Sequence, residues 1–341
     1  MAAPANTRET YGAIGIREDL SNIIYNISPM DTPYLNSAGR GSCDNTTFEW
    51  QTDELKVVAS NRQEEGNDYT ATAATEPRRL TNFTQISATQ VRSSGTAEAV
   101  DFAGRKSTQA YQLAKRAKEM KRDMETMLLD YTLKNIGASG TARQTASVGT
   151  WMGTPVVGTS TVIDGSNDGS DAARLTGLAN LGLGSVGPDG TTDPTDPAGA
   201  TFAVTLAGIN ATVSRIWDLG GTPDTMLCNS TVKATISSST VGGAVVAAPR
   251  NDIGSKNNIT AVNAVDVLVT DFGTFKVVPD RFIPATNVDF IDFDLWSIDY
   301  LRPFRTETLA KSGDSVKQLL IAEYGLRAKN GNGSGQLKSA I

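Results

Sequence analysis

The feature that most constrains the fold is a charged segment at 53–80 that has almost no large apolar side chains. It is flanked at 46–52 and 83–91 by alternating apolar and polar residues, a pattern that predicts two strands. We interpret this region as a long two-stranded arm with a polar middle. An isolated ribbon is only marginally stable in water, so we expect the arm to pack on another chain. A floppy surface loop is the alternative interpretation.

The composition also suggests burial between chains. Only 39% of the 341 residues are hydrophobic, which lies below the roughly 45–50% of ordinary globular proteins. Long stretches should therefore be exposed, or buried only against other subunits. The net charge of -6 argues against a protein that binds nucleic acid electrostatically.

The chain contains no histidine. Histidine supplies the base of most hydrolytic triads and is the commonest ligand of zinc and iron sites, so its absence argues against those enzyme classes. A carboxylate-dependent enzyme such as a glycosidase stays open at this point. Cys43 and Cys228 are expected to be reduced thiols. The N-terminus lacks a signal-peptide pattern and no run is long enough to span a membrane.

The strongest helical pattern lies at 106–136, where apolar residues recur at steps of four and three until Gly137. The methionine stripe is interpreted as packing rather than as a cofactor site. The basic residues alternate with acidic ones, which favours a solvated face with ion pairs over a DNA contact. The residues expected to face a sheet are Met120, Met124 and Met127, those expected to be exposed are Lys118 and Arg122, and Glu125 is placed on the polar side.

Gly, Thr, Ser and Asp dominate the segment at 137–200, which is too long for an ordinary loop and is expected to be a surface insertion. Residues 182–187 fit GxGxxG, but Pro188 follows where a dinucleotide site needs a helix. The run at 164–169 resembles the start of a calcium loop, yet Leu175 stands where a glutamate is required. We therefore expect no cofactor and no metal site.

A compact α/β pattern follows the insertion. The glycine-rich tail has a flexible composition. Helices are predicted at 205–219 and 230–238, and strands at 224–228, 265–270, 274–278, 288–293 and 316–328.

Four patches of sequence, in order over nearly the whole chain, resemble a family of tailed-bacteriophage major capsid proteins. The insertion around 159–200 is longer and richer in Thr and Gly than the family pattern. The patches are REDLSNIIYNISPMDTPYL (17–35) with TFEWQTD (47–53), IWDLGGTPD (216–224), DFGTFKVVPDRF (271–282), and YLRPF (300–304) with LAKSGDS (309–315).

The resemblance implies an α+β chain with the Hong Kong 97-type capsid fold. In that fold an extended E-loop hairpin lies over a neighbouring subunit, a long spine helix belongs to the P-domain, and an α/β A-domain sits near the capsomer axis. The implied divisions are 1–45 for the N-arm, 46–100 for the E-loop, 101–139 for the P-domain spine helix, 140–200 for a Gly/Thr-rich insertion, 201–300 for the A-domain, 301–329 for the return to the P-domain and 330–341 for a flexible C-terminal tail.

The implied function is that of a structural subunit and not of an enzyme. Copies of the chain would form hexamers and pentamers of an icosahedral head that encloses the double-stranded DNA of a tailed phage without sequence specificity. Portal, scaffolding and decoration proteins are the further partners implied, with no membrane. The location would be the virion, and the host cytoplasm before assembly. A non-viral encapsulating shell of the same fold is the alternative.

The arm carries charged residues of both signs and few apolar anchors. We therefore predict that it holds the adjacent subunit mainly through ion pairs and hydrogen bonds. Within this set, the two consecutive arginines are expected to meet carboxylates of that subunit. The candidate contact residues are Arg62, Glu64, Glu65, Glu76, Arg78 and Arg79.

Overall fold

The computed structural model describes most of the chain apart from its N-terminal region, parts of the arm and two long central segments. No helix in the described ranges is long and apolar enough to cross a bilayer. The N-arm before residue 28, the GxGxxG run and the calcium-loop-like run all lie outside these ranges. The described residues are 28–53, 55, 60–66, 68, 76–130, 132–152, 206–237, 267–285, 287–311 and 313–338.

A four-stranded sheet forms the body of the molecule, with strand order β1-β9-β10-β4. Its two long central strands run antiparallel, and β4 follows β10 from Ser94 opposite Ser315 to Gln85 opposite Tyr324. The predicted strand at 316–328 is confirmed, whereas β1 and β9 were not predicted. The bounds are Gly39–Ser42 for β1, Gln85–Ser94 for β4, Trp296–Thr308 for β9 and Ser315–Ala328 for β10.

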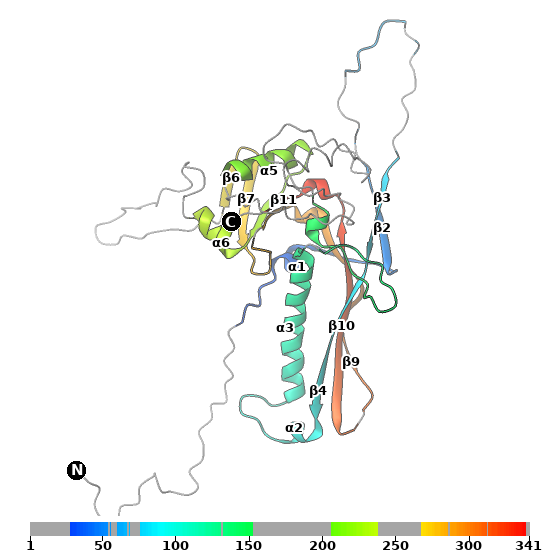
Figure 1. Ribbon diagram of the computed structural model, residues 1–341, viewed down its shortest axis with the longest axis vertical. Helices are drawn as coiled ribbons and strands as arrows, with labels where there is room; N and C mark the ends of the chain where they lie inside the picture. The colour runs from blue at the N-terminus through cyan, green and yellow to red at the C-terminus, as the bar shows by residue number, and fades with distance from the viewer. Residues whose placement is uncertain are drawn as a thin grey trace, which may run out of the picture.

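The long helix α3 (Thr108–Leu129) lies along this sheet (Figure 1). It begins at Ser107, whose side chain accepts a hydrogen bond from the Ala110 N–H at 3.2 Å. The predicted end at 136 is wrong: the helix stops at Leu129 and is about 33 Å long over its 22 residues. The chain then turns back on itself, because Thr132 and Ser147 exchange hydrogen bonds across a loop.

The buried face of α3 is close to the predicted one. Met120 and Met124 are buried, and Met120 packs against Leu320 and Ala322 of β10. Three predictions need correction. Met127 is only half-buried. Arg122 is half-buried too, with its guanidinium 5.6 Å from the centroid of the Phe282 ring, and Glu125 is fully buried.

A second, five-stranded sheet has the order β11-β8-β5-β7-β6. Helices α5 and α6 cover it, and the apolar side of α5 packs on the sheet through Ile209, Val213 and Ile216. The predicted helices and strands of this region are confirmed within a few residues. The bounds are Leu206–Asp218 for α5, Thr225–Cys228 for β5, Ser230–Ser237 for α6, Val267–Thr270 for β6, Gly273–Pro279 for β7, Asn287–Ile291 for β8 and Gly335–Lys338 for β11.

The expectation of a flexible tail from residue 330 is wrong for its described part. Strand β11 pairs antiparallel with β8 at the edge of the five-stranded sheet. Ser334 is buried, and its hydroxyl accepts hydrogen bonds from Trp296 Nε1 at 2.9 Å and from the Asp292 N–H at 3.2 Å. Small residues are required here because a Cβ on Gly333 would overlap Leu295. The glycines therefore permit close packing.

The predicted pairing of the arm is also wrong. Strand β2 (Thr47–Thr52) pairs antiparallel with β3 (Arg78–Phe83), and not with the strand at 83–91. The latter segment lies mostly in β4 and belongs to the body sheet. The two-stranded ribbon of the arm is therefore confined to β2, β3 and the chain between them.

Shorter elements complete the framework. One core cluster joins α1, α3, the 146–152 segment, β9 and β10, and a second fills the space between α5, α6 and the five-stranded sheet. The remaining bounds are Pro33–Ser37 for α1, Gly95–Ala99 for α2, and the 3-10 turns Val148–Thr150, Phe293–Leu295 and Gly331–Gly333.

Candidate assembly surface

The root of the ribbon, where β2 and β3 leave the body, is packed by aromatic rings. Phe48 is buried and stacks on Trp50, which in turn contacts Trp151 with 5.3 Å between ring centroids. Gly325 of β10 makes room for this, since a Cβ there would overlap the Phe48 ring. The root is thereby joined to the main core.

Asn82, near the end of β3, fixes the root by hydrogen bonds. Its side chain is completely buried. Nδ2 donates to Thr145 Oγ1 at 3.0 Å and to the Leu326 carbonyl at 2.6 Å, while Oδ1 accepts from the N–H groups of Phe83 at 2.9 Å and Ala146 at 3.0 Å. All four hydrogen-bonding positions of the amide are satisfied. A single side chain thus links β3, β10 and the loop after α3.

Glu323 of β10 forms a second buried connection beside the root. Its carboxylate accepts from Thr84 Oγ1 at 2.9 Å and from Arg302 Nε at 2.7 Å, and it forms an ion pair with Arg143. Arg143 Nε also donates to the Thr84 carbonyl at 2.6 Å. Two guanidinium groups compensate the buried negative charge, which is the condition under which such a charge is tolerated.

The tip of the ribbon is exposed, in contrast to its root. Leu55 is 99% exposed, and all described residues at 60–66 are exposed. The chain turns at Gly66, whose φ of 81° is accessible at little cost only to glycine. The described residues of the tip therefore contribute no buried side chain.

The structure spreads the six predicted contact residues along the ribbon and does not gather them into one cluster. Arg62 Nε donates to Ser60 Oγ at 3.2 Å. Arg79 forms an ion pair with Glu49 on the opposite strand of its own ribbon. Arg78 begins β3 opposite Thr52, and its side chain lies outside the described set; Glu64, Glu65 and Glu76 are exposed.

A group of buried carboxyl groups lies where α1, α3 and the five-stranded sheet meet. Both oxygens of Glu125 accept backbone N–H groups of α1, from Tyr34 and Leu35, each at 2.7 Å. Burial, followed by the charge of Asp280, raises the pKa of Glu125 to about 8. Burial likewise raises the pKa of Asp280, and burial together with the Asp280 charge raises the pKa of Asp289 to about 7.

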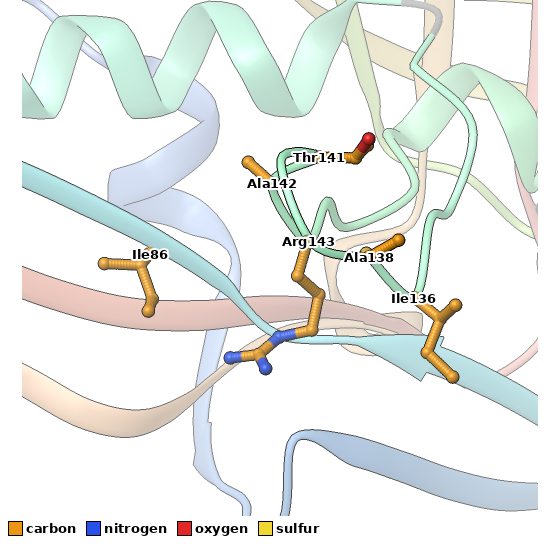
Figure 2. Close-up of a pocket in the computed structure, with 7 residues that line it drawn as sticks. Ile86, Ile136, Ala138, Thr141, Ala142 and Arg143 are labelled. Carbon is orange, nitrogen blue, oxygen red and sulfur yellow. The ribbon is translucent and has the colours of Figure 1, made fainter.

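An open hollow of about 450 Å³ lies beside the ribbon root (Figure 2). Ile86 of β4 and Ile136 of the loop after α3 are its large apolar residues, and they are 49% and 68% exposed. Arg143 crosses the base of the hollow toward β4 (Figure 2). The lining has one hydroxyl, that of Thr141, and no acid–base pair, so the hollow suits packing better than catalysis.

The polar face of α3 carries the expected ion pairs. Arg116 contacts Glu119 at 2.7 Å and Lys115 contacts the same carboxylate at 3.9 Å, all partly exposed. The ion pairs expected among these side chains are therefore present, although Arg122 is half-buried. Cys43 and Cys228 form no disulfide with each other and are buried, and burial raises the pKa of each thiol to about 11.

The sequence analysis did not identify the roles of Asn82, Glu323 and Glu125. These three buried residues form hydrogen bonds that connect separate elements of the fold. A signal existed for Asn82, because alternation in β3 places it on the same side as the partly buried Leu80. The cations that compensate Glu323 lie 180 and 21 residues away. No local pattern could reveal them.

Comparison with known proteins agrees with this architecture. Residues 3–340 match the family described as SU10 major capsid protein. The chain is 30% identical over 357 residues to the major capsid protein of Escherichia phage Phieco32, covering 97% of this chain and 96% of that protein.

Solved structures share the fold at low sequence identity. A chain of the cyanophage A-1(L) capsid asymmetric unit is similar with a TM-score of 0.67 and 14% identity, covering 95% of this chain and 97% of the other. The SrpI encapsulin complex of Synechococcus elongatus is similar with a TM-score of 0.51 and 9% identity, covering 93% and 92%. The fold is thus the Hong Kong 97-type capsid fold with mixed helices and strands. The sequence relationship goes further than the fold, and the chain belongs to the SU10 major capsid protein family.

Proposed function

We propose that copies of this chain form hexamers and pentamers that close into the icosahedral head of a tailed phage around its double-stranded DNA. The observation that carries the proposal is the ribbon of β2 and β3, whose root is fixed by Asn82 and the Phe48 stack while its tip is exposed. A rigid root with an uncovered tip suits a segment that is buried only when a neighbouring subunit covers it.

The divisions of the chain follow from this proposal. The ribbon serves as the E-loop, α3 with the four-stranded sheet as the P-domain, and the five-stranded sheet with α5 and α6 as the A-domain. The segment before β1 serves as the N-arm. The tail joins the A-domain, since β11 completes its sheet.

The contact between subunits is proposed to be mainly polar. Each exposed ion pair contributes only about 0–1 kcal/mol, but the same contact recurs at every subunit of a closed shell. The residues assigned to it are Arg62, Glu64, Glu65, Glu76, Arg78 and Arg79.

Further partners follow from the same function. Portal, scaffolding and decoration proteins would complete the head, and the subunit would occupy the host cytoplasm before assembly and the virion afterwards. The net charge of -6 makes strong attraction to DNA unfavourable. The genome is therefore retained by closure of the shell, without sequence specificity.

A charge-reversal experiment tests the ribbon contact. Arg78→Glu/Arg79→Glu should abolish fast-sedimenting shells while the circular dichroism of the subunit stays unchanged, because Arg79 is exposed and neither residue is needed for the backbone pairing of β2 and β3. The matched control is Glu49→Arg/Arg79→Glu, which restores the ion pair within the ribbon with reversed polarity. If Arg79 acts only within its own ribbon, this control should assemble normally. Full-size shells from the Arg78/Arg79 variant would overturn the proposed contact.

The encapsulating-shell alternative shares the fold, but the 30% identical relative is a phage protein. The nucleic acid content of shells purified from infected cells separates the two. Full-length double-stranded DNA is expected inside, and shells that hold protein cargo instead would contradict the phage assignment.

A further inference from the structure

Three buried carboxyl groups lie between parts of the subunit that are far apart in sequence. Glu125 lies near the end of α3, Asp280 directly follows β7, and Asp289 lies within β8. None of the three residues is more than 2% exposed. We call them the carboxyl cluster. Because α3 packs on the four-stranded sheet whereas β7 and β8 belong to the five-stranded sheet, the cluster lies at the boundary between two bodies, at the end of α3 where α1 is bound (Figure 1).

The neighbours of Asp289 show that its side chain faces this boundary. Asp289 lies opposite Leu227 of β5, and residues opposite each other on adjacent strands place their side chains on the same face of a sheet. Leu227 packs in the same core cluster as Met124 of α3. Burial, and then the charges of Glu125 and Asp289, raise the pKa of the Tyr34 hydroxyl, so both carboxyl groups lie near α1.

Hydrogen bonds attach the carboxyl groups to separate sides of the boundary. Both oxygens of Glu125 accept N–H groups of α1 at 2.7 Å. On the other side, Asp280 Oδ1 accepts the Phe282 N–H at 2.8 Å, and the Asp280 N–H donates to the Cys228 carbonyl at 2.9 Å. Asp289 Oδ1 has no hydrogen-bond partner among the described residues. Glu125 and α1 therefore form one unit, and Asp280 and Asp289 belong to the other.

No positive charge compensates the cluster in the part of the chain that the structure describes. None of the ion pairs there involves its three carboxyl groups, whereas the buried Glu323 contacts two guanidinium groups. A buried carboxyl group without a compensating charge favours its neutral form. The other titratable or charged groups beside the cluster are Tyr34 of α1, Arg122 of α3 with its guanidinium against the Phe282 ring, Cys228 of β5, the exposed Asp31 and Arg281, and Lys338 at the end of β11, whose side chain lies outside the described set.

We propose that the carboxyl cluster is a proton-controlled joint between α3 and the five-stranded sheet. While a carboxyl group of the cluster is neutral, the two bodies stay packed. At alkaline pH its O–H bond breaks, the proton passes to hydroxide to form water, and the electron pair stays on the carboxylate. The added negative charge increases repulsion across the boundary and weakens the contact between α3 and the sheet. Because a charged Glu125 accepts N–H groups more strongly than a neutral one, α1 stays on α3.

The environment of the carboxyl groups sets the pH range of this change. Burial, followed by the charge of Asp280, raises the pKa of Glu125 to about 8, and the same two causes raise the pKa of Asp289 to about 7. Both groups therefore lose their protons between about pH 6 and about pH 9. The joint is a property of the single subunit. It goes beyond the proposed assembly function, and its test requires no shells.

Distances between pairs of spin labels test the joint in the full chain. One pair joins Ala114→Cys on α3 to Thr274→Cys on β7, and the other joins Ala114→Cys to Asn36→Cys on α1; all three positions are exposed. Cys43 and Cys228 are buried and their thiol pKa values are about 11, so the introduced cysteines should react first at neutral pH.

The two distances are compared at pH 6 and pH 9, with far-ultraviolet circular dichroism to show that the chain stays folded. The α3–β7 distance should lengthen and its distribution should broaden at pH 9, while the α3–α1 distance stays constant. An α3–β7 distance that is the same at both pH values would overturn the proposal. Lengthening of both distances would also overturn it, because it would indicate a general loosening of the subunit.

Single carboxyl-to-amide variants of the labelled chain identify the responsible charge. Asp280→Asn removes the charge that acts on both other members of the cluster and keeps an oxygen for the Phe282 N–H. We expect it to reduce the lengthening at least about twofold. Asp218→Asn is the matched control, because it removes an exposed carboxyl group of α5, and it should respond like the unmodified chain. If circular dichroism shows that Asp280→Asn does not fold, Asp289→Asn is measured in its place with the same expectation. A full response in the folded variant would overturn the proposal.

Discussion

The root and the tip of the ribbon differ although a single pair of strands connects them. At the root, Asn82 is fully buried with four hydrogen bonds, and Phe48 stacks on Trp50. At the tip, the described residues at 60–66 are exposed, and Arg62 and Gln63 each donate a side-chain hydrogen bond to a residue two positions away. The subunit thus buries the point from which the ribbon leaves, whereas the described residues at 60–66 stay exposed. This difference is what a segment completed by assembly requires.

The largest expected effect concerns the body that supports the root. Met124→Asp places a charge among fully buried side chains, and we expect a loss of more than about 4 kcal/mol in the free energy of unfolding. Urea denaturation of the purified subunit measures this. Met127→Asp is the control, because Met127 is only half-buried and should cost much less. Equal losses of unfolding free energy in the two variants would contradict the observation that Met124 is buried and Met127 only half-buried.

A pair of asparagines compares root and tip directly. Asn82→Ala leaves the Phe83 and Ala146 N–H groups and the Leu326 carbonyl without their partner. Each buried unsatisfied group costs about 1–3 kcal/mol, so we expect a loss of about 3 kcal/mol in subunit stability. Asn61→Ala at the exposed tip should change it by less than about 0.5 kcal/mol. Similar losses of stability in the two variants, measured by thermal melting, would contradict the distinction between root and tip.

The buried carboxyl groups predict a smaller, pH-dependent effect. The pKa of Glu125 is about 8 in the folded chain and near 4.5 ordinarily, so the folded state binds a proton that the unfolded state releases at lower pH. Stability should therefore be greatest below about pH 4.5 for this group and fall as the pH rises to about 8. Asp280→Asn removes the neighbouring charge and keeps a side-chain oxygen that can accept the hydrogen bond from the Phe282 N–H. In the Asp280→Asn variant we expect the melting temperature to decline less between pH 5 and 9. A decline as steep as that of the unmodified chain would contradict this account of the buried carboxyl groups.

A higher salt concentration should weaken the contacts proposed for the tip and leave the stability of the root unchanged. Raising the ionic strength from 0.1 to 1 M shortens the Debye length from about 10 to about 3 Å. We expect fewer intact shells by sedimentation and an unchanged melting temperature of the subunit, because the root is held by buried contacts. A shell yield that rises with salt would indicate that apolar contacts dominate the assembly interface.

Local patterns predicted most of the elements but not the contacts between them. The Met120 and Met124 spacing identified α3, and the alternation at Phe48 and Trp50 identified β2. The partner of β2 was mistaken because β3 and β4 adjoin at Phe83–Gln85, and alternation continues through the change of sheet. The end of α3 and the tail were mistaken because distant residues, such as Ser147 and Trp296, fix them. The contacts of the tip could not be derived because they are proposed to involve another chain.

Hydrogen–deuterium exchange tests the central claim most directly, by comparing unassembled subunits with intact shells. Backbone amides of β2 and β3 near the root, such as those of Phe48 and Asn82, should exchange slowly in both states, because they pair within the ribbon and lie against the core. Amides at 60–66 should exchange rapidly in subunits and become protected only in shells. Equal and rapid exchange of the tip in both states would show that no neighbouring subunit covers it, and would contradict the account.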